Sequence, residues 1–197
     1  MGAVPKVSEE HLTRRREEIL GAARRCFARY GYEGATVARL EQESGLSRGA
    51  IFNYFESKDD LFVALVERDQ ERLGRVWLED GYAAAVREIA AEDPAWLGVY
   101  VEATRRIRTD PEFARRRTEA GTPMREAVVG WLERARTEGE LRDDVPAETL
   151  AAFHGIVLDG LAVRAAAGLP PADVEAILRL VDDATRGDPD MRARRSA

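Results

Sequence analysis

Residues that form covalent cross-links or metal sites are scarce in this chain of 197 residues. There is one cysteine, Cys26, which excludes an intramolecular disulfide. It lies beside Phe27 in a helical pattern, so we expect a buried thiol that packs as a small hydrophobic side chain. The two histidines, His11 and His154, lie far apart in the sequence, and no metal site is expected.

Signatures of enzymes, membrane spans and secretion are also missing. The chain has no phosphate-binding glycine-rich loop, no HExxH motif, no paired cysteines and no serine elbow. It has no run of about 18 apolar residues, the length that a membrane helix requires. Residues 1–16 lack the apolar segment of a secretory signal. We therefore expect a cytoplasmic protein with no membrane segment, no cofactor and no enzymatic activity.

Alternating apolar and polar residues, the mark of half-buried strands, are not found either. Helical spacing is common instead, and 45% of the residues are hydrophobic, enough for a substantial core. We predict an all-α fold of about nine helices. In the second half of the chain, prolines and Asp-Pro pairs mark helix starts. These helices are expected at residues 82–91, 94–108, 111–137, 146–167 and 171–186. Pro123 should kink or split the third of them.

One stretch, from Thr36 to Lys58, has the pattern of two short helices joined by a tight turn. Gly45 lies between the helices, where a positive φ permits a sharp turn. Ser47 stands at the N-cap of the second helix, where its hydroxyl can accept a hydrogen bond from a free backbone N–H group. This arrangement is typical of a helix-turn-helix motif, whose second helix enters the major groove of DNA.

The second helix of this motif presents a polar face suited to DNA. Arg48 can form a bidentate hydrogen bond with guanine, whereas Tyr54 and Lys58 can reach phosphate oxygens. Gly49 costs helix stability, of order 1 kcal/mol against alanine, and close approach of the backbone to DNA is one explanation. The candidate DNA-binding residues are Thr36, Ser47, Arg48, Gly49, Ala50, Asn53, Tyr54 and Lys58. The alternative is an ordinary helical hairpin with a solvated polar face.

Three segments give this region a family resemblance: GYEGATV at 31–37, SGLSRGAIFNYF at 44–55 and KDDL at 58–61. In order and spacing they resemble the TetR family of bacterial one-component repressors, and GYEGATVARLE and SRGAIFNYF are most similar to its actinobacterial aconitase-repressor branch. The resemblance implies a homodimeric repressor that binds a double-stranded DNA operator. One departure is Glu41, where the family usually has an alanine packed against the second helix.

Charge is distributed unevenly along the chain. The net charge of −6 would oppose DNA binding, but residues 1–58 carry +2 and the remainder carries −8. Because charges beyond a Debye length of ~8 Å are screened, an acidic distal domain does not prevent binding by a basic one. We predict a DNA-binding domain at 1–60 that includes a mobile arm at 1–12, a helical regulatory and dimerisation domain at 61–186, and a disordered tail at 187–197.

The last two helices of the distal domain are unusually apolar. A helix that is apolar nearly all round must be covered on more than one side. The family resemblance implies a four-helix bundle across a two-fold axis. We therefore expect a homodimer formed by these helices on a palindromic operator; the alternative is a monomer with a thick core. The residues concerned include Ala151, Phe153, Ile156, Val157, Leu161, Ile177, Leu178 and Val181.

Polar residues also occur in the distal domain where core is expected. A buried arginine needs an anionic partner, either a side chain or an acidic metabolite. The resemblance favours a small anionic effector such as citrate, with or without Mg²⁺. The candidate ligand-binding residues are Arg105, Arg106, Arg125, His154 and Asp159. An ion pair with Glu102 would explain Arg106 as well, and a packed core histidine would explain His154. The other interpretation is a constitutive regulator whose distal domain only dimerises.

Overall fold

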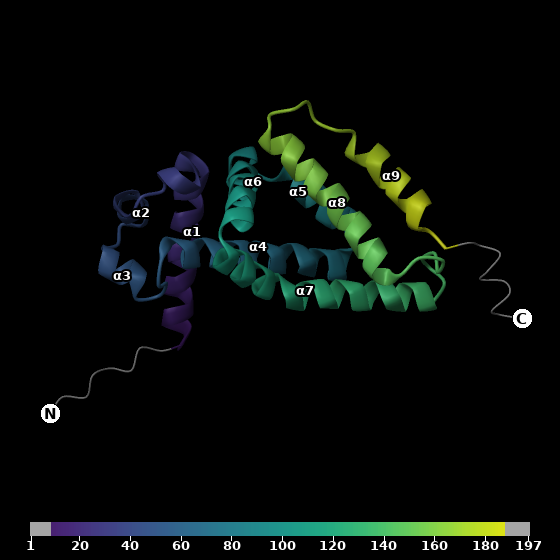
Figure 1. The fold of residues 1–197 in the computed structure, drawn as a ribbon, viewed down its shortest axis with the longest axis horizontal. Coiled ribbons are helices and arrows are strands. Elements are labelled where there is room, and N and C mark those ends of the chain that lie inside the picture. The colour runs from purple at the N-terminus through teal and green to yellow at the C-terminus, as the bar shows by residue number, and fades with distance from the viewer. Residues whose placement is uncertain (1–8, 188–197) are drawn as a thin grey trace, which may run out of the picture.

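The computed structural model describes residues 9–187, and within this range it does not describe the side chains of Glu9 and Arg105. All regular elements in the range are helices, apart from one isolated antiparallel bridge between Leu141 and Arg186. The predicted all-α fold is therefore confirmed. The helices, labelled in Figure 1, are α1 (Glu9–Gly34), α2 (Val37–Ser44), α3 (Arg48–Phe52), α4 (Lys58–Asp80), α5 (Tyr82–Ala91), α6 (Pro94–Thr109), α7 (Pro111–Thr137), α8 (Ala147–Ala166) and α9 (Val174–Thr185).

Side-chain caps fix where most of these helices begin. The hydroxyls of Thr36, Ser47 and Ser57 each accept a hydrogen bond from the backbone N–H three residues later. The carboxylates of Asp93 and Asp110 cap α6 and α7, and a proline follows each. Such caps satisfy backbone N–H groups that have no partner within the helix. The helix starts expected at Thr36, Ser47, Asp93 and Asp110 are confirmed.

Both ends of the described range have more ordered backbone structure than the sequence predicted. Residues 9–12, assigned to a mobile arm, belong to α1, and residues 1–8 lie outside the description. Gly187, assigned to a disordered tail, is buried, and its N–H donates to the Glu140 carbonyl at 3.1 Å. Residues 188–197 are not described. Helix α9 begins at Val174 and not at residue 171, because the Asp173 carboxylate provides the cap.

Helix α7 continues through Pro123 and is not split there. Close contacts with α4 hold it on both sides of the proline. A Cβ atom on Gly121 would lie 3.2 Å from the side chain of Gln70, and one on Gly74 would overlap the side chain of Met124. The small residues let the two helices approach closely, so packing against α4 offsets the hydrogen bond that proline removes.

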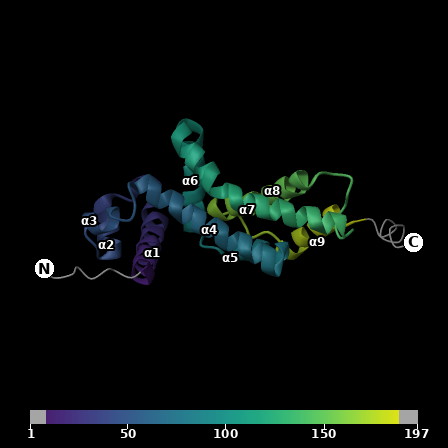
Figure 2. The ribbon, with the colours of Figure 1, turned by 90° about the horizontal axis from the view of Figure 1, so that it is seen from below.

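Figures 1 and 2 show α1, α2 and α3 grouped at one end of the molecule, with α4 extending from them along its length. Helices α5 and α7 pack along α4, α8 packs against α5, α6 and α7, and α9 packs against α5. The aromatic core beside this group includes Phe27 of α1 and Phe62 of α4, and Trp96 of α6 and Phe113 of α7 also enter it. The two domains therefore share one hydrophobic cluster, and a shift of α6 or α7 must disturb the packing of the first domain.

Candidate DNA-binding surface and ligand pocket

Helices α2 and α3 form the helix-turn-helix. Leu40 and Ile51 are buried in the core that these helices share with α1 and α4. Gly45 ends α2 with a φ of 68°, and its N–H donates to the Glu41 carbonyl at 2.9 Å. This left-handed conformation costs glycine little and other residues more, which explains a glycine at this turn.

Most of the candidate DNA-binding residues lie on the exposed side of this motif. Those exposed to solvent are Thr36, Ser47, Arg48, Gly49 and Asn53, whereas Ala50, Tyr54 and Lys58 are partly buried. The Arg48 guanidinium lies 5.9 Å from the ring centre of Phe52. The start of α3 thus offers a cation, a hydroxyl and a bare stretch of backbone together, as a helix entering the major groove requires.

Lys58 already has partners within the protein. Its Nζ donates to the Tyr32 carbonyl at 3.0 Å and lies 4.5 Å from the centre of the Tyr32 ring. A phosphate bound by this ammonium group would have to share or replace that hydrogen bond. The assignment of Lys58 to a phosphate contact stays a prediction.

Gly49 has no packing role within the subunit. A Cβ atom placed on it meets no other atom within 4 Å, and its φ is not positive. Neither a tight contact nor a special backbone conformation therefore requires glycine at this helical position. No contact within the subunit compensates for the helix stability that Gly49 costs. This favours the explanation that close approach to DNA requires glycine at this position.

A polar cluster, here called the clasp, joins the DNA-binding domain to α6 and α7. It consists of Tyr32, Asp59, Asp60, Arg106 and Arg116. Arg106 donates to Asp59 at 2.6 Å and to the Tyr32 hydroxyl, which in turn donates to Asp59. Arg116 pairs with Asp60. Because these groups are partly buried, their hydrogen bonds are stronger than surface ones.

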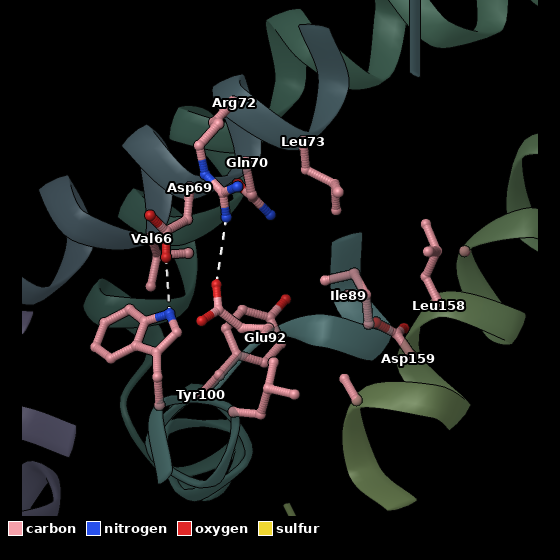
Figure 3. Close-up of a pocket in the computed structure, with 14 residues that line it drawn as sticks. Val66, Asp69, Gln70, Arg72, Leu73, Ile89, Glu92, Tyr100, Leu158 and Asp159 are labelled. Carbon is pink, nitrogen blue, oxygen red and sulfur yellow. Dashed lines mark hydrogen bonds and ion pairs between the residues drawn. The ribbon is translucent and has the colours of Figure 1, made fainter. Parts of the chain in front are cut away.

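A cavity of ≈190 Å³ lies between α4, α5, α6 and α8, and Figure 3 shows its walls. The lining is mostly apolar, with aromatic rings from Trp96 and Tyr100. Trp96 donates from Nε1 to Asp69 at 2.7 Å, and Arg72 donates to Glu92 at 3.3 Å; both interactions are dashed in Figure 3. Asp159 of α8 lies across the cavity from them, beside Ile89 (Figure 3).

The carboxylates in this wall have different surroundings. Burial alone would raise the pKa of Glu92, but hydrogen bonds from Arg24 and the Asp93 backbone, with the charge of Arg72, hold it below its ordinary value. Asp159 is exposed by accessible area, yet protein packed around its carboxyl raises its pKa. No hydrogen bond or ion pair to Asp159 occurs within residues 9–187. The charge of Arg117 acts against this rise in pKa, but no hydrogen bond would have to be broken for a ligand to reach the carboxylate.

The candidate ligand residues do not come together in one site. Asp159 lines the cavity, whereas Arg106 belongs to the clasp. Arg125 is exposed on α7 and does not line the cavity. His154 packs in a separate aromatic cluster, and the side chain of Arg105 lies outside the description. Sequence patterns did not point to the main wall residues, because Arg72, Glu92 and Trp96 follow ordinary amphipathic patterns.

His154 is buried in an aromatic cluster with Trp77 and Tyr82. Its ring centre lies 4.2 Å from that of Tyr82 and 5.3 Å from that of Trp77, and 4% of the residue is exposed. Within the described part of the chain, neither its Nδ1 atom nor the Trp77 Nε1 atom has a hydrogen-bond partner. Burial therefore lowers the pKa of His154 to about 4. The imidazole is neutral and packs as a core side chain.

Two family profiles match this chain. The profile of "Bacterial regulatory proteins, tetR family" matches residues 19–65, and that of "BetI-type transcriptional repressor, C-terminal" matches residues 79–187. This chain belongs to the TetR family. The fold agrees: Salmonella enterica GusR superposes with a TM-score of 0.73 at 24% identity, covering 91% of this chain and 97% of GusR.

Curated relatives refine the family assignment. The HTH-type transcriptional repressor Rv1474c of Mycobacterium tuberculosis is 45% identical over 93% of this chain and 99% of its own length. The HTH-type transcriptional repressor AcnR of Corynebacterium diphtheriae is 43% identical over 93% and 97%. The chain is a DNA-binding transcriptional repressor of the TetR family and not an enzyme, as the sequence predicted. Its resemblance to the aconitase-repressor branch is confirmed by the AcnR relatives.

The neutral state of His154 gives this TetR-family protein a pH-dependent stability. The folded-state pKa of about 4 lies below the ordinary value of 6.5. The stabilising contribution is therefore present above pH 6.5 and is lost as pH falls toward 4. We expect unfolding free energy to drop by about 2 kcal/mol between pH 7 and 5 through this residue. Denaturant unfolding of His154→Phe should lack that component, and His11→Gln should retain it. An equal pH dependence in His154→Phe and the wild type would contradict the assignment.

Gly49→Ala should separate stability from DNA binding. Alanine fits the open space at this helical position and should stabilise the free protein by up to about 1 kcal/mol. The added methyl group should weaken DNA binding, because it holds the backbone away from the groove. Thermal unfolding and DNA titration of the same variant test both effects. If DNA affinity rises along with stability, Gly49 does not approach DNA closely.

Proposed function

We propose that this TetR-family repressor acts in the cytoplasm as a homodimer on a palindromic operator and releases it when a small molecule binds the distal domain. The observation that carries the proposal is the position of α6. Trp96, Leu97 and Tyr100 near its start line the cavity, and Arg106 near its end belongs to the clasp. One helix therefore contacts both the ligand pocket and the DNA-binding domain.

The proposed release depends on this connection. A ligand shifts an equilibrium only when it binds one arrangement better than the other. Arg106 of the clasp lies about 9 Å further along α6 than Tyr100 of the cavity, at 1.5 Å per residue. A ligand that displaces α6 would therefore also move the clasp. The clasp holds Asp59 and Asp60 in the first turn of α4, directly after the recognition helix. A hundredfold loss of operator affinity needs ~2.7 kcal/mol of coupling, within the usual allosteric range.

The proposed dimer interface is the apolar face of α8 and α9. Of the six exposed large hydrophobic side chains in residues 9–187, five lie on these helices or between them: Phe153, Ile156, Val163, Leu169 and Leu180. By length and composition α8 is also apolar enough to span a membrane, although it contains charged residues. In the subunit, 22% of its most apolar 18-residue stretch is buried. A second subunit would cover this face as expected for an obligate interface.

The alternative is a constitutive regulator whose distal domain only dimerises. A filled distal core would favour that interpretation. The ≈190 Å³ cavity, lined by Arg72 and by an unpartnered Asp159, favours a ligand-responsive protein instead.

The dimer proposal predicts that charged substitutions on α8 and α9 make the protein monomeric. Ile156→Glu and Leu180→Glu place charges on side chains that are each 68% exposed in the subunit. Both variants should fold, sediment as monomers at micromolar concentration and lose most operator affinity. Leu12→Glu, at a 44% exposed position of α1, is the matched control and should remain dimeric. A wild-type protein that sediments as a monomer would refute the proposed dimer.

A citrate-like acid remains our proposed effector, and the wall suggests the form in which it binds. Arg24 and Arg72 are already paired with Asp69 and Glu92, so a bare polyanion would find neither arginine free at this wall. No group of three or more metal-ligating side chains occurs among the described residues, so a metal would have to arrive with the acid. Chelation by Mg²⁺ reduces the charge of the acid, and we therefore propose the magnesium complex as the ligand.

Genome-wide capture of bound DNA will provide the operator, and titration with citrate tests its release. We expect citrate with Mg²⁺ to bind in calorimetry and to release the operator, whereas citrate with EDTA should do neither. Asp159→Asn should change the affinity, and Asp182→Asn on the exposed face of α9 should not. Equal binding with EDTA would refute the magnesium requirement. If no acid binds below millimolar concentration, the effector class is wrong, while the repressor assignment is unaffected.

A further inference from the structure

We propose that Glu41 is a specificity-determining residue, which sets the ratio of affinities for operator and for other DNA by fixing the first turn of the recognition helix. Glu41 lies in α2, one turn before the end of that helix. Its Oε1 atom accepts a hydrogen bond from the backbone N–H of Arg48 at 2.6 Å. This is the position where the sequence departs from the alanine usual in the family. The contact joins a side chain of the first motif helix to the start of the second.

The recognition helix needs such support because it is short. Helix α3 has five residues, and a helix of this length is not stable through its own hydrogen bonds. Ser47 binds the N–H of Ala50 at 3.3 Å, and Glu41 binds the N–H of Arg48. The N–H of Gly49 has no partner within the described chain. Two of the three amides at the helix start are therefore fixed by side chains, one from the cap residue and one from α2.

Glu41 is itself held in place by the turn. Its carbonyl accepts hydrogen bonds from the Gly45 N–H at 2.9 Å and from the Ser44 hydroxyl at 3.4 Å. The end of α2, the turn and the start of α3 thus form one hydrogen-bonded unit with Glu41 at its centre. An alanine here would leave the Arg48 amide without this acceptor, and the base-reading end of α3 would sample more orientations.

The charge of Glu41 also favours binding to the operator over binding to other DNA. No ion pair to Glu41 is found among the described residues, whereas its neighbour Glu43 pairs with Arg29 at 3.4 Å. An unpaired carboxylate beside Arg48 repels DNA phosphates, and this repulsion applies to every sequence. In the operator complex the fixed Arg48 gains base contacts that offset it. Random DNA provides no such gain, so the carboxylate weakens non-specific binding more than specific binding.

Three variants separate positioning from charge. Glu41→Gln keeps the acceptor and removes the charge, whereas Glu41→Ala removes both. Glu43→Gln, on the same helix, is the matched control for charge. Affinities for the captured operator and for a random duplex of equal length should be measured over a range of salt concentrations, with thermal unfolding to confirm the fold.

We expect Glu41→Gln to bind random DNA several-fold more tightly, with operator affinity little changed. Glu41→Ala should also lose about tenfold in operator affinity, the scale of one charged hydrogen bond. The operator-to-random ratio should fall in the order wild type, Glu41→Gln, Glu41→Ala, and Glu43→Gln should keep the wild-type ratio. An unchanged ratio in both Glu41 variants would overturn the proposal, as would an equal fall in Glu43→Gln. If Glu41→Ala does not fold, the comparison of Glu41→Gln with Glu43→Gln still decides.

Discussion

The guanidinium group of Arg106 links the two domains where they share one hydrophobic cluster. Arg106 binds Asp59 and the Tyr32 hydroxyl, and it lies 5.2 Å and 5.0 Å from the ring centres of Tyr32 and Phe113. Charge, hydrogen bonding and cation–π attraction therefore act on the same side chain. Removing it would leave a partly buried Asp59 without its main partner. The clasp thus fixes the start of α4 against α6, and with it the orientation of the recognition helix relative to the ligand pocket.

The recognition helix illustrates how function is placed on an otherwise stable scaffold. The packed core beneath it, built on Phe27, Tyr32 and Phe62, has aromatic contacts of 5.0 to 5.7 Å. Helix α3 itself has only Ile51 fully buried, and its start is held by the polar contacts of Ser47 and Glu41. A DNA-reading element that is short, exposed and glycine-containing needs this external support. The alanine usual in the family at position 41 could not provide it.

The distal domain combines two features that the subunit alone does not satisfy. One is the exposed apolar face of α8 and α9, and the other is a cavity whose wall contains Asp159 without a partner. Helix α8 contributes to both features, and it also carries the buried His154. Dimerisation and ligand binding, as we propose them, would therefore act on neighbouring faces of the same helix, because Asp159 lies three residues after Ile156.

The sequence by itself determined the helices, their caps and the helix-turn-helix, because these depend on contacts between residues close in the chain. Thr36, Ser47 and Ser57 cap helices through atoms three residues away, and Gly45 turns the chain through its own φ. Local patterns were wrong about a split at Pro123, where packing against α4 keeps α7 continuous. They also failed for the pocket and the clasp. Arg106 meets Asp59 across 47 residues, and Arg72 meets Glu92 across 20. No spacing rule connects such pairs, so only the tertiary structure could bring them together.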